Sequence, residues 1–224
     1  MTETVRPAHL PLTDTERRLL QDTTFFPAKA AIAEKVKQWL TELRDALRTE
    51  MASGCFLAPE GTDVQQGQLV KGEHLLDFPY HYLDCPKYFS QGEMFAYRTL
   101  VWWGHHVVFA LILQGEHLAR YKANLLAAYD QLADRGLSLL MTDTPWEWRQ
   151  GDAYLLPLLR RNRDVVEAAL AGRPFLKLHR CLPFDHPSII DGRLAEEGVN
   201  TFRLLAPIFT SDAGIGASRR SRGK

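Results

Sequence analysis

The run from Thr99 to Gly115, TLVWWGHHVVFALILQG, is the most apolar stretch of the chain and restricts its fold more than any other segment. Its residues are mostly β-branched or aromatic, which suits a pleated, packed surface and favours a strand over a helix. From Val107 to Leu113, apolar side chains occupy both alternation faces. The segment is therefore predicted to lie inside a sheet with both faces covered.

The apolar run has to break somewhere. A single strand from Met94 to Leu113 would extend about 66 Å at roughly 3.3 Å per residue, which is too long for a domain of this size. Gly104 is the expected break, because glycine permits a turn or a bulge. Either residues 95–103 fold back against residues 106–113, or one strand bends sharply. His105 and His106 lie at the bend, where successive side chains point to opposite faces.

The rest of the chain reads as alternating helical and extended segments. Apolar periodicity and capping residues predict helices at 14–22, 28–53, 117–135, 155–171 and 195–209. Thr13 and Glu16 have the spacing of a capping box at the start of the first of these helices. Two short strands are expected within 69–88, broken by Pro79 and Pro86, with further strands at 137–141 and 175–182. The last of these has the pattern of a strand buried on one face. The sequence thus predicts an α+β fold, with a mainly antiparallel sheet centred on residues 95–113 and amphipathic helices packed against it.

The composition is that of an ordinary globular protein. A chain of 224 residues could form one large domain or two small ones, and it is long enough to bury a substantial core. Residues 1–12 are predicted to be a flexible N-terminal arm, residues 13–210 a single α+β domain, and residues 211–224 a disordered basic tail.

Charge and cysteine usage narrow the class of protein. The 27 basic and 27 acidic residues cancel, which gives no global electrostatic attraction to nucleic acid or to an anionic membrane. Cys55, Cys85 and Cys181 lack the short spacing of a zinc or redox site. The N-terminus has no apolar leader, and no stretch is long enough to span a membrane. We expect a soluble cytoplasmic protein that binds neither membrane nor nucleic acid.

The central run and the order of elements around it resemble the YktB-like proteins, a family of uncharacterised small bacterial cytosolic proteins. In that family too, a helical N-terminal half precedes a Trp- and Phe-rich strand containing a His, followed by an amphipathic helix with a Tyr. The corresponding stretches here are WWGHHVVFALILQG and HLARYKANLLAAYDQL. The resemblance covers about residues 13–209. It implies a compact α+β domain and a bacterial protein, and it assigns no functional residue.

The two central histidines are the most conspicuous polar feature of the sequence. Burying an imidazole is costly unless it is hydrogen-bonded, so a histidine pair inside an apolar run calls for an explanation. In the functional interpretation, His105 or His106 faces a cleft as a catalytic acid, base or ligand contact. In the structural interpretation, both are satisfied histidines at a strand bend. The sequence leaves both open.

If the strands pair as predicted, several polar and aromatic residues come near these histidines. Apolar walls with a few convergent polar groups are typical of a small-molecule site. The predicted ligand-binding residues are Trp102, Trp103, Tyr80, His81, Lys71 and Arg98. Residue types alone would allow a metal site of His74, His81 and Asp84 with a central histidine. No spacing matches a known ligand pattern, so we predict no metal site and assign no cofactor.

The segment DTPWEW offers a second, weaker candidate. Asp143 and Glu147 could act as acid and base, and Trp146 and Trp148 could stack on a sugar or base. We favour a tryptophan-bearing loop packed as a lid over the core.

Two function classes follow from the sequence. The first is a protein that binds a small polar ligand in a pocket bordered by the central strand, with or without catalysis. The alternative is a non-catalytic interaction or regulatory module, whose aromatic surface binds a protein partner or a second copy and whose histidines are structural. The two classes differ in shape, because the first needs a concave site and the second a flat aromatic patch.

Overall fold

The structure is a computed structural model that describes residues 10–52 and 56–210. The chain divides into two compact units, the first ending at Lys35 and the second beginning at Val36. The predicted N-terminal arm falls mostly, and the predicted basic tail wholly, outside the described residues, as does Cys55. The predicted domain limits, residues 13–210, stay a prediction.

In chain order the elements are α1 (Asp14–Leu20), α2 (Phe25–Met51), β1 (Gln68–Leu75), β2 (Phe78–Ser90), β3 (Glu93–Trp102), β4 (His106–Gln114), α3 (Leu118–Ala127), α4 (Tyr129–Leu132), β5 (Leu137–Leu140), β6 (Leu155–Pro157), the 3₁₀ helix η1 (Arg160–Asn162), α5 (Arg163–Ala171), β7 (Phe175–Leu182), α6 (Pro187–Ile190) and α7 (Leu194–Phe209).

Locally determined caps set the helix boundaries of the first unit. At the start of α1, the Glu16 backbone N–H donates to Thr13 Oγ1 at 3.2 Å, and the Thr13 backbone N–H donates to the Glu16 carboxylate at 2.6 Å. This is the capping box that the sequence predicted. At the start of α2, the Asp22 carboxylate accepts from the backbone N–H groups of Thr24 and Phe25.

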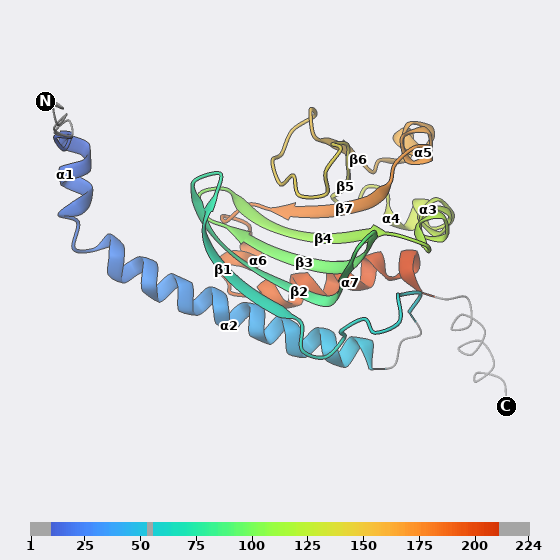
Figure 1. Cartoon of the computed structure of the whole chain (residues 1–224), viewed down its shortest axis with the longest axis horizontal. Helices are drawn as coiled ribbons and strands as arrows, with labels where there is room; N and C mark the ends of the chain where they lie inside the picture. Colours follow the sequence, from blue (N-terminus) through green and yellow to red (C-terminus); the bar gives the residue numbers. More distant parts are fainter. Residues whose placement is uncertain (1–9, 53–55, 211–224) are drawn as a thin grey trace, which may run out of the picture. The chain divides into compact units, whose positions relative to one another are not determined.

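The second unit contains a seven-stranded antiparallel sheet in the order β1-β2-β3-β4-β7-β5-β6 (Figure 1). β3 and β4 form a hairpin in which Met94 pairs with Gln114 and Trp102 with His106. Gly104 lies in the turn with φ +72°, a conformation that glycine adopts without strain. The predicted fold-back at this glycine and the predicted α+β class with an antiparallel sheet are both confirmed.

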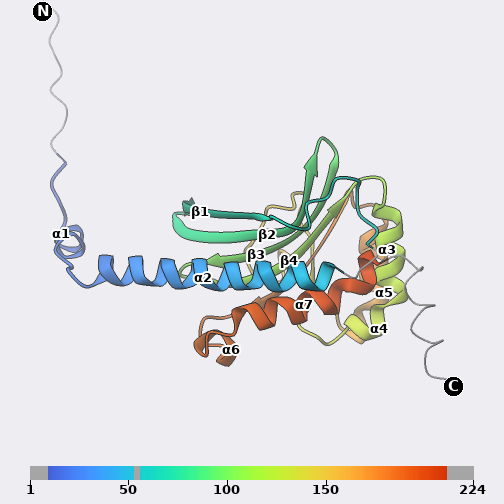
Figure 2. The same ribbon diagram turned by 90° about the horizontal axis from the view of Figure 1, so that it is seen from below.

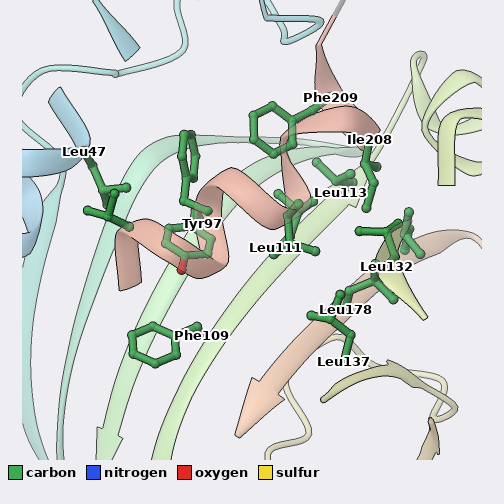
Figure 3. Close-up of a cluster of buried hydrophobic side chains, with 14 of the residues drawn as sticks. Leu47, Tyr97, Phe109, Leu111, Leu113, Leu132, Leu137, Leu178, Ile208 and Phe209 are labelled. Atoms are coloured by element: carbon green, nitrogen blue, oxygen red, sulfur yellow. The ribbon is translucent and has the colours of Figure 1, made fainter. Parts of the chain in front are cut away.

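β4 is the central strand, and eight of its nine residues are buried on one face or the other. Helices cover one of these faces: Figure 2 shows α7 running side by side with the C-terminal half of α2 along the sheet. Figure 3 shows part of this apolar cluster, which includes Tyr97, Phe109 and Leu111 of β3 and β4 and Ile208 and Phe209 of α7. The Tyr97 hydroxyl donates to the Gly198 carbonyl at 2.6 Å, which ties α7 to the sheet.

Three predicted elements differ from the structure. The helix expected at 155–171 is wrong in its first half, because residues 155–157 form β6, which pairs with β5. Pro157 is tolerated there because β6 is an edge strand. The helix expected at 117–135 is interrupted at Ala128. The prolines expected to break 69–88 lie inside one strand, β2, whose pairing with β3 shifts register between Asp84 and Lys87.

The two edges of the sheet are both irregular. β6, at one edge, has only three residues and ends in a proline. β1, at the other, shifts register between Gly72 and Leu75, and carries the ion pair between Lys71 and Glu73. No helix among the described residues is long and apolar enough to cross a membrane.

The close contact between α7 and the sheet yields a stability prediction. A Cβ atom on Gly198 would lie 2.6 Å from a methyl group of Leu43 and 3.2 Å from the Phe109 ring. We expect Gly198→Val to lower the free energy of unfolding by about 1–3 kcal/mol, because the added atoms overpack this contact. Urea unfolding measures the change. Gly172→Ala is the control, since its Cβ meets nothing within 4 Å. Equal effects of the two substitutions would contradict the packing argument.

Candidate functional site

The second face of the sheet is covered by a loop instead of helices. Residues 141–154, between β5 and β6, lie on the side of the sheet opposite to α7 (Figure 1). We call this side the loop face. Its apolar cluster consists of Leu100, Trp102, Val108, Ala110, Ile112 and the loop residue Trp148. The preferred interpretation of DTPWEW, a loop packed down over the sheet, agrees with the burial of Trp148.

A row of polar side chains crosses the loop face. Asp84 pairs with Arg98, Arg98 with Ala110, and Ala110 with His179 on four neighbouring strands. Cross-strand partners leave the sheet on the same side, so these four residues share the loop face. Ala110 has the small side chain of the row and separates the arginine from the histidine.

Arg98 and Asp84 form a buried ion pair. The guanidinium donates from Nε and Nη2 to the two carboxylate oxygens, both at 2.6 Å. Burial raises the pKa of Asp84, and the hydrogen bonds from Arg98 oppose that increase. Such bidentate pairing is the strongest geometry available to these groups. The guanidinium carbon lies 3.8 Å from the centre of the Tyr82 ring, so the cation also stacks on an aromatic face.

A pocket opens beside this ion pair. Its volume is about 180 Å³, and its lining residues are Leu75, Tyr80, Tyr82, Arg98, Leu100, Trp146 and Trp148. The rings of Tyr80 and Tyr82 are parallel, with their centroids 6.1 Å apart. Arg98 also lies 5.0 Å from the Trp146 ring. Four aromatic rings and one guanidinium therefore meet at one small concavity.

Lys177 holds the loop above the pocket. Its side chain is fully buried, and Nζ donates to the carbonyls of Pro145 at 2.9 Å and Glu147 at 2.7 Å. The same amine lies 3.3 Å from the centre of the Trp148 ring. Burial, reinforced by the charge of Arg98, holds the pKa of Lys177 well below its usual range. Arg173 adds a second attachment, because its guanidinium donates to the carbonyls of Met141 and Thr142.

Two buried histidines lie under the loop. Nε2 of His106 is 3.3 Å from the Trp148 carbonyl, which can only accept, so that nitrogen must carry the proton. Burial lowers the pKa of His106. His179 is 1% exposed, and neither of its ring nitrogens has a hydrogen-bond partner. Burial, the charge of Lys177 and His106 together lower the pKa of His179 to about 3.

The structure divides the predicted site residues into two groups. Tyr80, Arg98, Trp102 and His106 lie on the loop face, and the first two line the pocket. Trp102 is buried, and its indole N–H donates to the Leu75 carbonyl at 3.0 Å. His105 is exposed in the turn and stacks on Trp102 with ring centroids 3.7 Å apart.

The other three predicted residues lie away from the pocket. His81 neighbours Tyr80 along β2, so its side chain leaves the opposite side of the sheet, where the Trp103 indole donates to it at 3.3 Å. Lys71 is the cross-strand partner of His81 and contacts Glu73 at 3.5 Å. His81 and Asp84 thus leave opposite sides of the sheet. No group of three or more His, Cys, Asp or Glu among the described residues could hold a metal ion.

The sequence did not mark Lys177 as a site residue, and it treated β7 as buried on one face only. The structure shows the first five residues of β7 buried on both faces. In the sequence, Lys177, His179 and Cys181 alternate with mostly apolar residues. This alternation indicates a buried polar face only if β7 is known to pair with β4. A strand beside the central one has both faces covered, so its polar face is buried as well.

No family model, no curated protein and no solved structure matches the chain. The functional inference therefore comes from the geometry of the loop face itself.

Burial of His179 predicts a pH dependence of stability. Between the ordinary histidine pKa of 6.5 and the folded value of about 3, the unfolded chain binds a proton that the folded chain does not. Stability should therefore fall as the pH falls through this window, by up to about 1.4 kcal/mol per pH unit from His179 alone. His179→Leu should flatten the curve of unfolding free energy against pH. Urea titrations across the window measure the slope.

His105→Leu is the matched control for this experiment, because His105 is exposed. Its curve should fall more steeply with falling pH than that of His179→Leu. Both variants keep His106 and Lys177. Identical slopes in wild type and His179→Leu would contradict the inferred burial.

The attachment of the loop yields a second prediction. Lys177→Met keeps an unbranched side chain but removes the donor to the carbonyls of Pro145 and Glu147. We expect backbone amides of residues 142–150 to exchange hydrogen about tenfold faster, since an unmade buried hydrogen bond costs about 1–3 kcal/mol. Mass spectrometry of deuterium uptake measures the change. Lys87→Met is the control: it removes a donor to Gln68 instead and should leave the exchange rates of the loop unchanged. Unaltered exchange in Lys177→Met would mean that the loop is held by other contacts.

Proposed function

We propose that the protein binds a small polar ligand with a flat, unsaturated part in the pocket of the loop face. The observation that carries this proposal is the lining of the cavity, where Tyr80, Tyr82, Trp146 and Trp148 meet Arg98. Ligand sites are typically concave and apolar, with a few placed polar groups that orient the ligand. The cavity of about 180 Å³ is smaller than the roughly 300–1,000 Å³ of typical ligand pockets, which favours a small ligand.

The side chains that line the pocket also restrict the chemical class of the ligand. Aromatic faces stack on flat groups, which favours a planar ligand over a saturated one. Arg98 is fixed in place by Asp84 and stacked on Tyr82, so its guanidinium is preorganised toward a hydrogen-bond acceptor. A carbonyl or carboxylate oxygen fits that requirement.

The contacts of the two central histidines support a structural role for both. His106 is bonded to the loop backbone, and His105 stacks on Trp102 outside the pocket lining. The proposal therefore concerns binding and assigns neither histidine to a reaction.

The alternative function is a protein-interaction module. It is favoured by the partial exposure of Phe89 and of the loop residue Trp146, which contact each other with ring centroids 6.2 Å apart. A partner would then cover the rim of the pocket instead of filling it.

Two further predictions belong with this proposal. Membership of the YktB-like family, with the bacterial origin that it implies, stays a prediction and supplies no functional residue. A cytoplasmic location also stays a prediction, based on the number and spacing of the cysteines.

A thermal-shift screen tests the proposed function. Purified protein is screened against metabolites that include planar carboxylates and amides, each beside a saturated analogue. A ligand at a hundred times its dissociation constant should stabilise the fold by about 2.7 kcal/mol. Trp146→Ala should abolish most of that shift, because it removes one aromatic wall. Trp146 is 44% exposed, so this variant should still fold.

Phe184→Ala is the matched control, since Phe184 is another partly exposed aromatic residue and lies outside the pocket lining. It should keep the full shift. A shift that survives Trp146→Ala would place the ligand elsewhere on the protein. The absence of any shift across the screen would remove the pocket proposal and favour the interaction module.

A further inference from the structure

The first unit exposes an unusual concentration of large apolar side chains. No residue from 10 to 35 is buried. Among the described residues, seven of the fourteen exposed large hydrophobic side chains lie in this short segment. We call them the N-terminal patch: Leu10, Leu12, Leu19, Leu20, Phe25, Phe26 and Ile32.

Five of these side chains belong to the helices α1 and α2, and Leu10 and Leu12 precede α1. Thr13 and Glu16 cap α1, and Asp22 caps α2. Helix stability in proteins comes mainly from packing of an apolar face, and a seven-residue helix is marginal in water by itself. Capped helices with exposed apolar side chains are therefore the form expected of a segment that is buried against a partner.

The stripe along α2 supports this interpretation. Val36, Leu40 and Leu43 are buried at steps of three and four residues. Ile32 lies four residues before Val36 and Phe25 seven before Ile32, so they continue the same stripe, yet both are about half exposed. The apolar face of the helix is longer than the part of it that is covered.

We propose that the N-terminal patch is the interface with a second copy of this chain. Residues 10–35 contain four acidic and four basic residues, so the segment carries no net charge. A helix that binds an anionic membrane is rich in Lys and Arg on its polar face, which this balance does not provide. Mixed charges of both signs suit self-association.

The arrangement of charges on α1 is also self-complementary. Its first turn carries Asp14 and Glu16, and its last turn carries Arg17 and Arg18. A twofold axis perpendicular to the helix makes its two copies antiparallel, and this arrangement brings the acidic turn of each beside the basic turn of the other.

The size of the patch matches a modest interface. Seven large side chains that each expose roughly 100 Å² present about 700 Å² per copy, close to the roughly 800 Å² per partner of a standard interface.

Light scattering during size-exclusion chromatography tests this interface on the full chain. At roughly 100 µM the measured mass of the wild type should be twice that of one chain. A dimer with a micromolar dissociation constant should dissociate on dilution. The double substitution Leu20→Asp, Phe26→Asp should raise the dissociation constant at least about tenfold. Ile190→Asp is the control, because Ile190 is exposed to the same degree as Leu20 but lies in α6.

Helix content provides an independent measurement. Circular dichroism of the wild type should show a loss of helix on dilution that parallels dissociation, and the double variant should show the lower value at all concentrations. A monomeric wild type at high concentration would overturn the proposal, as would a double variant that dimerises as the wild type does. Monomers that sediment with phosphatidylcholine vesicles would overturn it in favour of a lipid surface.

Discussion

The burial of β4 on both faces is the constraint on which the rest of the structure depends. A strand with Val107, Phe109 and Leu111 on one side and Val108, Ala110 and Ile112 on the other exposes apolar surface unless two separate layers cover it. Amphipathic helices supply the first layer, since their apolar stripes match one face of a sheet. The second layer is a loop, which has no continuous apolar stripe of its own. The two layers are therefore stabilised by different interactions.

The helical layer is held on the sheet mainly by the apolar area that it buries. The loop layer is held mainly by hydrogen bonds from side chains to its backbone. Lys177, Arg173 and His106 contact carbonyls of the loop, and Trp148 adds one large ring to the apolar cluster. Buried donors of this kind are costly to desolvate and costly to leave unpaired. The sheet therefore carries a layer of titratable groups under the loop, which explains why the perturbed pKa values of Lys177, His179 and His106 occur together.

Features that depend on local sequence could be predicted. The turn at Gly104, the capping box at Thr13 and the α+β class follow from residue type and periodicity. The first residue of α5 could not be predicted from the sequence. The apolar run around Pro157 is compatible with either an edge strand or a helix, and it forms a strand because it pairs with β5. Tyr80 and Arg98 were predicted as site residues by the assumed strand pairing. Lys177 was missed, and His81 lies outside the pocket lining, because burial and the side of the sheet that a residue faces depend on long-range register.

The two irregular edges of the sheet limit how the protein can associate. A regular edge strand offers its unpaired N–H and C=O groups to any other strand, which is a common route to aggregation. Here β6 is only three residues long and ends in Pro157, while β1 carries alternating charges and a shift of register near Gly72. Backbone ladders cannot easily extend from either side. Copies of this chain can thus meet through side chains without the sheet growing into a fibril.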